Sequence, residues 1–448
     1  MRSYVRGLLG LGRDVKLFLL FTLLANIGYG VFQLIFNLYL LELGYHEDDI
    51  GAFSAVQTIC LAAGAATLAF MLNRFGTWRC LTFGVGFFLL VSFLLAFAEN
   101  ERTLLAFAVL SGLGMAYLFN PTMPFIMEWV RQEQRGHIAA VAFSLISLSI
   151  TFGSLMGGFF PSFIAAVSGS FEAKSIPAYR WTLVAGSTIA LTGLIPLFLM
   201  REPRRKRTAD SKIVDRSAET PAERRRVRLD MAVFVACGGL MSLGVGMVAP
   251  FYNVYLTTLG ASSRQTGYVF ALGGAVAAVV GLSAPAVSRR FGPLTAVMLL
   301  RSAVVPFYLL LIVSPGMAIA IVAFVVRQIT ISMAWPIDST FIGEVLPARS
   351  RSPVFALRSA AWNFGFAGAS YLAGKIIVHT GYNWTFGSLL VFTLLSAGLF
   401  VGYYGRHPAV RAGQLASGLH RRGAGSASPL LRVAGQAPGH SSVSQATE

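Results

Sequence analysis

Arg327 and Asp338 are charged residues within an otherwise apolar stretch, "VAFVVRQITISMAWPID" at 322–338. On one helix they lie on nearly the same face but about three turns apart, which is too far for direct contact. A guanidinium in apolar surroundings needs a partner, and it binds carboxylate or phosphate groups through two parallel hydrogen bonds. Two roles therefore remain open for Arg327: contact with an anionic group of a small-molecule substrate, or a structural role between helices.

Asp338 has a better partner on the following apolar segment. Arg358 is expected at about the same depth as Asp338 on the neighbouring helix, since the chain turns back between them. Opposite charges removed from water are retained where they pair with each other. The spacing predicts an Asp338–Arg358 ion pair.

Polar side chains form a stripe along the first long apolar segment. Asn26, Tyr29, Gln33 and Asn37 follow one another at spacings of three and four residues, which places them on one face of a helix. Such a stripe avoids lipid. It faces either a partner helix, where each hydrogen bond contributes about 0.6 kcal/mol, or a polar cavity.

Motifs for enzymatic chemistry are missing from the sequence. It contains no HExxH, no Gly-x-Ser-x-Gly and no phosphate-binding glycine loop, so we expect no enzyme and no cofactor. The segment "HEDD" (46–49) is expected to be a solvated acidic turn rather than a metal site. Glu128 and Asp338 are the only acids inside the predicted apolar segments, each near one end, so no carboxylate is expected at the middle of a membrane to carry protons.

The composition defines the class of protein that positions these residues. Hydrophobic residues make up 55% of the 448 and charged residues 12%, whereas an ordinary soluble domain carries about 25% charge. Uncharged runs such as 17–41 and 80–98 are each long enough to cross a hydrocarbon layer of about 30 Å as a helix. We predict an all-α polytopic membrane protein. Its twelve predicted spans are 15–40, 50–72, 79–98, 103–129, 136–167, 179–200, 231–257, 264–288, 294–314, 316–341, 352–379 and 384–404.

Lysine and arginine predict the orientation, because they concentrate in cytoplasmic loops. With the N-terminus inside, the outer loops hold few of them, and nearly all others lie at cytoplasmic ends of helices. The net charge of +17 owes much to the basic segment 201–230, which we assign to anionic lipid and not to nucleic acid. We predict a multi-pass, monomeric protein of the cell membrane with both termini in the cytoplasm. The basic residues of the outer loops are Arg102, Lys174, Arg180 and Arg264.

The two sides of the basic segment repeat each other. The stretch "FNLYLLELGYHEDDIG" (36–51) returns as "YNVYLTTLGASSRQTG" (252–267), so that Asn253 follows Asn37 by 216 positions. The same offset relates the "RFG" turns at 74–76 and 290–292. The predicted organisation is a cytoplasmic N-terminus 1–14, a six-helix half 15–200, a basic cytoplasmic linker 201–230, a second six-helix half 231–404 and a disordered cytoplasmic tail 405–448.

Six plus six helices, a basic central loop and an Arg-x-Gly turn after the second helix of each half resemble the major facilitator superfamily. The segment "AFMLNRFGTWR" (69–79) is similar to the family's Gly-x-Leu-x-Asp-Arg-x-Gly-Arg pattern, with Ala69, Asn73 and Thr77 as departures. The resemblance implies the two-half fold and transport by alternating access, with one site between the halves. It also implies a cytoplasmic gate of ion pairs, carried here by the repeated charges Arg74, Glu128, Arg135, Arg290, Glu344 and Arg351.

The resemblance favours a substrate cavity for the polar residues at depth. We assign Asn26, Tyr29, Gln33, Asn363 and Arg327 to substrate binding, and Asn37 with Asn253 to an outer gate or a helix cap. The expected function is transport of a small solute, and Arg327 favours a solute with an anionic group. Two alternatives remain: efflux of amphipathic drugs or lipids through an apolar cavity, and a sensor without turnover.

Overall fold

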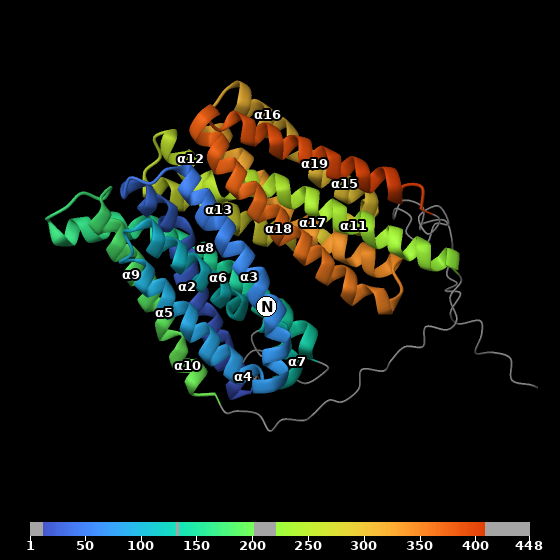
Figure 1. Ribbon diagram of the computed structural model, residues 1–448, viewed down its shortest axis with the longest axis horizontal. Coiled ribbons are helices and arrows are strands. Elements are labelled where there is room, and N and C mark those ends of the chain that lie inside the picture. The colour runs from blue at the N-terminus through green and yellow to red at the C-terminus, as the bar shows by residue number, and fades with distance from the viewer. Residues whose placement is uncertain (1–11, 131–133, 201–220, 408–448) are drawn as a thin grey trace, which may run out of the picture.

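The computed structural model describes residues 12–130, 134–200 and 221–407, which form helices and no strand within these ranges. Two bundles lie against each other, one in blue to green and one in yellow to red (Figure 1). The first bundle consists of α2 (Arg13–Glu42), α3 (Glu47–Phe75), α4 (Thr77–Arg79), a π-helical turn (Cys80–Val85), α5 (Gly86–Leu95), α6 (Glu101–Phe119), α7 (Thr122–Trp129), α8 (Arg135–Ser168), α9 (Ile176–Thr192) and α10 (Leu194–Phe198).

The second bundle repeats this order. Its elements are α11 (Pro221–Val248), a 3-10 turn (Ala249–Phe251), α12 (Tyr252–Thr258), α13 (Ser263–Gly281), α14 (Ala284–Phe291), α15 (Pro293–Ala303), α16 (Val305–Val313), α17 (Met317–Val345), α18 (Ala348–Thr380) and α19 (Asn383–Tyr404).

The number of spans can be compared with the predicted twelve. Ten helical segments of the described ranges are long and apolar enough to cross a membrane, and α13 with α14 makes an eleventh if this pair, bent by 52°, counts as one. The remaining predicted span, 352–379, lies within α18, which holds Arg358 and Lys375 and is less apolar. The all-α, multi-pass architecture with two similar halves is confirmed.

The helix that contains most of the predicted span 231–257 begins earlier than that span. Helix α11 begins at Pro221, inside the predicted basic linker 201–230. Proline is favoured in the first turn of a helix, and the alanine, glutamate and arginines that follow are strong helix formers, so the helix extends beyond its apolar part. The predictions for 1–11, 201–220 and the tail from 408 onward lie outside the described residues.

The sequence repeat is visible in the backbone. Gly76 and Gly292, the glycines of the two "RFG" turns, have φ of 86° and 79°, which favours glycine. The "HEDD" segment 46–49 opens α3 with a capping box, and residues 262–265 open α13 with another. The acidic turn is therefore a helix start, and no metal-binding group is found among the described residues.

Three apolar clusters show where the halves join. The largest contains residues of both bundles, such as Leu34 and Leu256, and lies toward the loops 43–46 and 259–262. The other two belong to one bundle each and lie toward the "RFG" turns. We call the shared end the closed end and the opposite one the open end.

Candidate functional site

Glycines bring the two halves into backbone contact at the closed end, where α3 packs on α18 and α8 packs on α13. A Cβ atom on Gly51 would lie 2.5 Å from the carbonyl oxygen of Ser370. A Cβ atom on Gly267, the repeat mate of Gly51, would lie 2.9 Å from the Cα of Gly158. Side chains at these positions would separate the helices.

Two asparagines join the halves reciprocally. Asn37 donates from Nδ2 to the carbonyl oxygen of Pro250 at 2.5 Å, and Asn253 donates to that of Leu34 at 2.8 Å. Because residue 250 is the repeat mate of residue 34, the two bonds are related by the pseudo-twofold symmetry. The outer-gate role assigned to this pair stays a prediction, and the contact between halves that it requires is present.

A further contact crosses the closed end at its rim. The Tyr382 hydroxyl donates to Glu47 Oε1 at 2.9 Å. Burial and the neighbouring carboxylate raise the pKa of Tyr382 well above its ordinary value, so the hydroxyl keeps its proton. The guanidinium of Arg264 on one half lies 4.7 Å from the ring of Phe159 on the other. The glycine contacts, the asparagine bonds and the Glu47–Tyr382 bond together form what we call the seal.

A cavity of about 200 Å³ lies between the halves next to the seal. Its polar wall comes mainly from the N-terminal half, and none of the described residues that line it carries a charge. The C-terminal half contributes mostly apolar surface. The lining residues are Tyr29, Phe32, Gln33, Phe36, Asn37, Phe53, Ser54, Gln57, Thr58, Met115, Ala249, Pro250, Asn253, Phe270 and Phe366.

Some of the predicted substrate-binding residues line the cavity and others do not. Tyr29 and Gln33 line the cavity. Asn26 and Asn363 do not belong to its lining: each donates to a carbonyl one turn back in its own helix, at 2.7 Å and 2.8 Å. These bonds use only the Nδ2 group of each amide, and the buried Oδ1 of Asn26 has no hydrogen-bond partner. Gln57, which was not predicted, does line the cavity and donates to Ser111 at 3.0 Å.

Arg327 is buried inside the C-terminal half and does not line the cavity. Its guanidinium lies 5.5 Å from the ring centre of Tyr252 and 5.4 Å from that of Phe324. Its Nε has no hydrogen-bond partner, and no carboxylate pairs with it in the described part of the chain. Aromatic faces thus take the place of a counter-ion.

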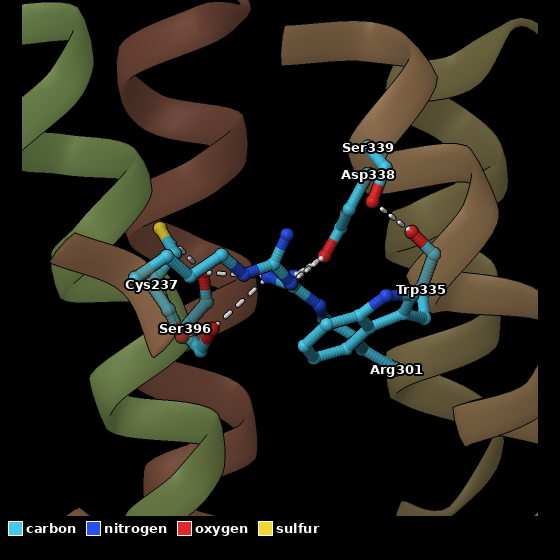
Figure 2. Close-up of polar contacts among 7 residues, drawn as sticks. Cys237, Arg301, Trp335, Asp338, Ser339 and Ser396 are labelled. Atoms are coloured by element: carbon cyan, nitrogen blue, oxygen red, sulfur yellow. Dashed lines mark hydrogen bonds and ion pairs between the residues drawn. The ribbon is translucent and has the colours of Figure 1, made fainter. Parts of the chain in front are cut away.

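One carboxylate oxygen of Asp338 accepts hydrogen bonds from two arginines, of which Arg301 is labelled in Figure 2. This oxygen, Oδ2, accepts from Arg358 at 3.0 Å, the contact predicted from the sequence, and from Arg301 at 2.8 Å. Arg301 also donates to the hydroxyl of Ser396 on α19 at 3.0 Å. Arg301 is thus an exception to the prediction that nearly all basic residues lie at cytoplasmic ends of helices, since it lies within the apolar run 296–313.

The charged cluster Arg301–Asp338–Arg358 has one more positive than negative charge and is nearly excluded from solvent. Rings compensate in part: the Arg358 guanidinium lies 4.4 Å from Phe234 and 4.7 Å from Trp335. The cluster connects α15, α17, α18 and α19 within one half. It does not reach the lining of the cavity.

The six residues assigned to a cytoplasmic gate lie at the open end and form no ion pair with one another. Glu128 and Glu344 are exposed. Arg135 and Arg351 instead donate to carbonyl oxygens at the ends of the preceding helices, to Val130 at 3.1 Å and Leu346 at 3.2 Å. Arg74 and Arg290 each lie over the next phenylalanine in the chain. The gate stays a prediction for a state that is closed at this end.

Two pseudo-symmetric helical bundles with a polar cavity between them define a multi-pass membrane transport protein. The chain belongs to the Major Facilitator Superfamily, whose family profile matches residues 18–352. No curated protein matches the sequence significantly.

Solved structures share the fold at low identity. A mutant of the nucleoside transporter NupG is 15% identical with a TM-score of 0.68, covering 87% of this chain and 99% of its own. A D-xylose–proton symporter is 15% identical with a TM-score of 0.64, covering 86% and 96%. A bacterial homologue of the human lysosomal transporter Spinster, inward-facing and unoccupied, is 16% identical with a TM-score of 0.65, covering 86% and 95%.

Proposed function

We propose that the protein transports a small solute by alternating access and that this structure is the state open to the cytoplasm. The seal carries the proposal, because the apolar cluster that the described parts of the two halves share lies at the closed end, and the glycine and asparagine contacts repeat by the pseudo-twofold symmetry. The positive-inside distribution of lysine and arginine supports a cytoplasmic position for the open end. The similarity to an inward-facing relative supports the same assignment.

The cavity favours an uncharged polar solute. Tyr29, Gln33 and Gln57 offer hydroxyl and amide groups, and Phe270 and Phe366 offer flat apolar surface. A volume of about 200 Å³ is below the roughly 300–1,000 Å³ of pockets for drug-sized ligands. A sugar or nucleoside combines these properties, and two of the structural relatives are named for xylose and nucleoside transport.

An anionic solute is the second candidate. The observation that favours it is the guanidinium of Arg327, whose Nε lacks a partner. Contact with a solute would require Phe324 or Tyr252 to move, since these rings lie against the guanidinium. The polar wall argues against the third candidate, an apolar cavity for amphipathic drugs or lipids.

Matched solutes distinguish these candidates. In sealed proteoliposomes we expect uptake of D-xylose or uridine, and little uptake of the anions D-xylonate and uridine 5′-monophosphate. Gln33→Ala and Gln57→Ala should each weaken binding of the neutral solute about 5- to 10-fold, the loss of one hydrogen bond. Asn363→Ala, at an amide outside the cavity, is the control and should bind normally.

Each outcome has a separate meaning. Uptake of only the anionic members, abolished by Arg327→Gln, would establish the second candidate. Binding without uptake of any member would support a sensor and contradict transport.

A further inference from the structure

The amide of Gln57, which lines the cavity, is held in one orientation by a residue outside the lining. Its Nε2 donates to the hydroxyl oxygen of Ser111 at 3.0 Å, and this hydroxyl donates its own proton to the carbonyl oxygen of Ala108 at 3.2 Å. A carbonyl oxygen can only accept and a hydroxyl has one proton, so the Ser111 oxygen must accept. The two bonds therefore determine that the Gln57 nitrogen, and not its oxygen, faces Ser111.

Backbone contact keeps Ser111 in this place. The side chain of Ser111 is 1% exposed, and Gly112 follows it on α6. A Cβ atom on Gly112 would overlap the carbonyl oxygen of Gln57 on α3. Because the two helices touch through their backbones here, the distance between the serine hydroxyl and the Gln57 amide is set by the fold.

The arrangement leaves the oxygen of the Gln57 amide for a solute. Within the described residues the Gln57 side chain forms no hydrogen bond other than the one to Ser111. Both lone pairs of Oε1 and one N–H of Nε2 are therefore unused. The amide offers the cavity more accepting than donating capacity.

Two further lining residues have the same polarity. Asn37 uses its Nδ2 on the carbonyl oxygen of Pro250, which leaves its Oδ1 available. Thr58 gives its only hydroxyl proton to the carbonyl oxygen of Ser54 at 2.7 Å. The polar groups of the cavity that are fixed by internal bonds thus present mainly oxygen lone pairs.

The C-terminal half has no such groups at the matching positions. The repeat mates of Gln57 and Thr58 are Gly273 and Gly274, and the repeat mate of Ser111 is Arg327. The accepting wall therefore belongs to the N-terminal half and does not follow from the two-half fold.

We propose that the cavity recognises its solute as a hydrogen-bond donor, a polyhydroxylated compound with a hydroxyl group that donates to Gln57 Oε1, and that Ser111 positions this acceptor. The inference rests on the function proposed above and narrows it. Oxygen lone pairs favour hydroxyl protons and repel the unprotonated oxygens of an anion, so the same wall disfavours an anionic solute.

Solutes in which one hydroxyl is replaced by fluorine or by hydrogen test this, because fluorine is close to a hydroxyl in size but cannot donate a hydrogen bond. The probes are D-xylose, uridine and their monodeoxyfluoro and monodeoxy derivatives, with dissociation constants from thermal-shift titrations of the purified full chain. At the hydroxyl that donates to Gln57, both derivatives should bind about 5- to 10-fold more weakly than the parent solute. Fluoro derivatives that bind as tightly as the parent at every hydroxyl would overturn the proposal.

Ser111→Ala frees the Gln57 amide to turn its nitrogen toward the cavity. This variant should bind the parent solute about five-fold more weakly, and the difference between the parent and the fluoro derivative should fall to about two-fold or less. Ser92→Ala is the matched control, because Ser92 is a buried serine of the same half that donates within its own helix, to Phe88 at 2.9 Å. It should leave all dissociation constants unchanged.

A purely structural role of Ser111 predicts a different result. Ser111→Ala would then weaken the parent and both derivatives to the same extent, and this outcome would overturn the proposal, as would unchanged discrimination. Binding of D-xylose or uridine without a fluorine penalty would contradict this inference alone. Absence of binding of both parent solutes would contradict the proposed function and the inference with it.

Discussion

The two halves share one fold and one sequence repeat but differ in where their polar side chains lie. In the N-terminal half, polar side chains such as Gln33 and Gln57 face the cavity, and the interior near the open end is aromatic, with Phe18 stacked on Phe125 at 3.8 Å. In the C-terminal half the charges lie inside the bundle, and the cavity wall is mostly apolar. The positions that hold Arg301, Asp338 and Arg358 correspond by the repeat to Val85, Thr122 and Ala142.

The polar residues that line the cavity are therefore separate from the charged residues that join helices within a half. Each half has an apolar cluster of its own near the open end, and the C-terminal half has the charged cluster in addition. A buried charged group is strongly destabilising when its partner is removed, yet often dispensable when the whole group is replaced. The N-terminal half has the same backbone arrangement without such a cluster, because the corresponding positions hold Val85, Thr122 and Ala142.

The largest expected effect is in the charged cluster. Asp338→Asn leaves two buried guanidiniums without a counter-ion and should cost about 3–5 kcal/mol of stability. The triple variant Arg301→Met, Asp338→Leu, Arg358→Met replaces the whole cluster with apolar side chains of similar volume and should recover much of that loss. Melting temperature and monodispersity in detergent measure both, with Thr122→Ala as the control in the N-terminal half. A triple variant less stable than Asp338→Asn would show that the cluster is essential to this half.

The next effect is at the glycines of the seal. Gly51→Leu or Gly267→Leu should keep the closed end from closing and cost that state about 1–3 kcal/mol. A single cysteine at Asp48 should then react faster with an impermeant reagent. Gly398→Leu, where no atom lies within 4 Å of a built Cβ, is the control. Equal reactivity in all variants would place the closed contact elsewhere.

The asparagines should have a smaller and symmetric effect. Asn37→Ala and Asn253→Ala each remove one hydrogen bond between the halves, about 0.5–1.5 kcal/mol, and should open the closed end to the same extent. The same cysteine reactivity measures this. A strong effect of one variant and none of the other would contradict the reciprocal arrangement.

The smallest effect is expected at the open end. Glu128→Gln and Glu344→Gln should leave this state unchanged, because both carboxylates are exposed. They should destabilise the opposite state by about 0–1 kcal/mol for each lost surface pair. Cysteine accessibility from the cytoplasm and the transport rate report the change. Normal values in both variants would remove these residues from the gate.

The fold was predictable because membrane spans leave a strong sequence signal and the repeat shows the two halves directly. Asp338 and Arg358 could be paired since each is a rare charge at a definable depth. Arg301 also lies in an apolar run, but it is close to the end of the predicted span 294–314, so its depth alone does not predict a place in the cluster.

The candidate site was less predictable. Helical spacing places Asn26 on the same stripe as Tyr29 and Gln33, yet an amide can bond to its own helix and leave the cavity. Gln57 reaches the cavity only through the packing of α3, which its local sequence does not reveal.

If the two ends open in alternation, distances between spin labels at the two ends must change in opposite directions. Labels at Asp48 and Arg264 report the closed end, and labels at Met127 and Gly343 report the open end; each pair is related by the repeat. In the Gly51→Leu background we predict that the first distance lengthens and the second shortens relative to the parent protein. Lengthening at the closed end with no change at the open end would contradict alternating access.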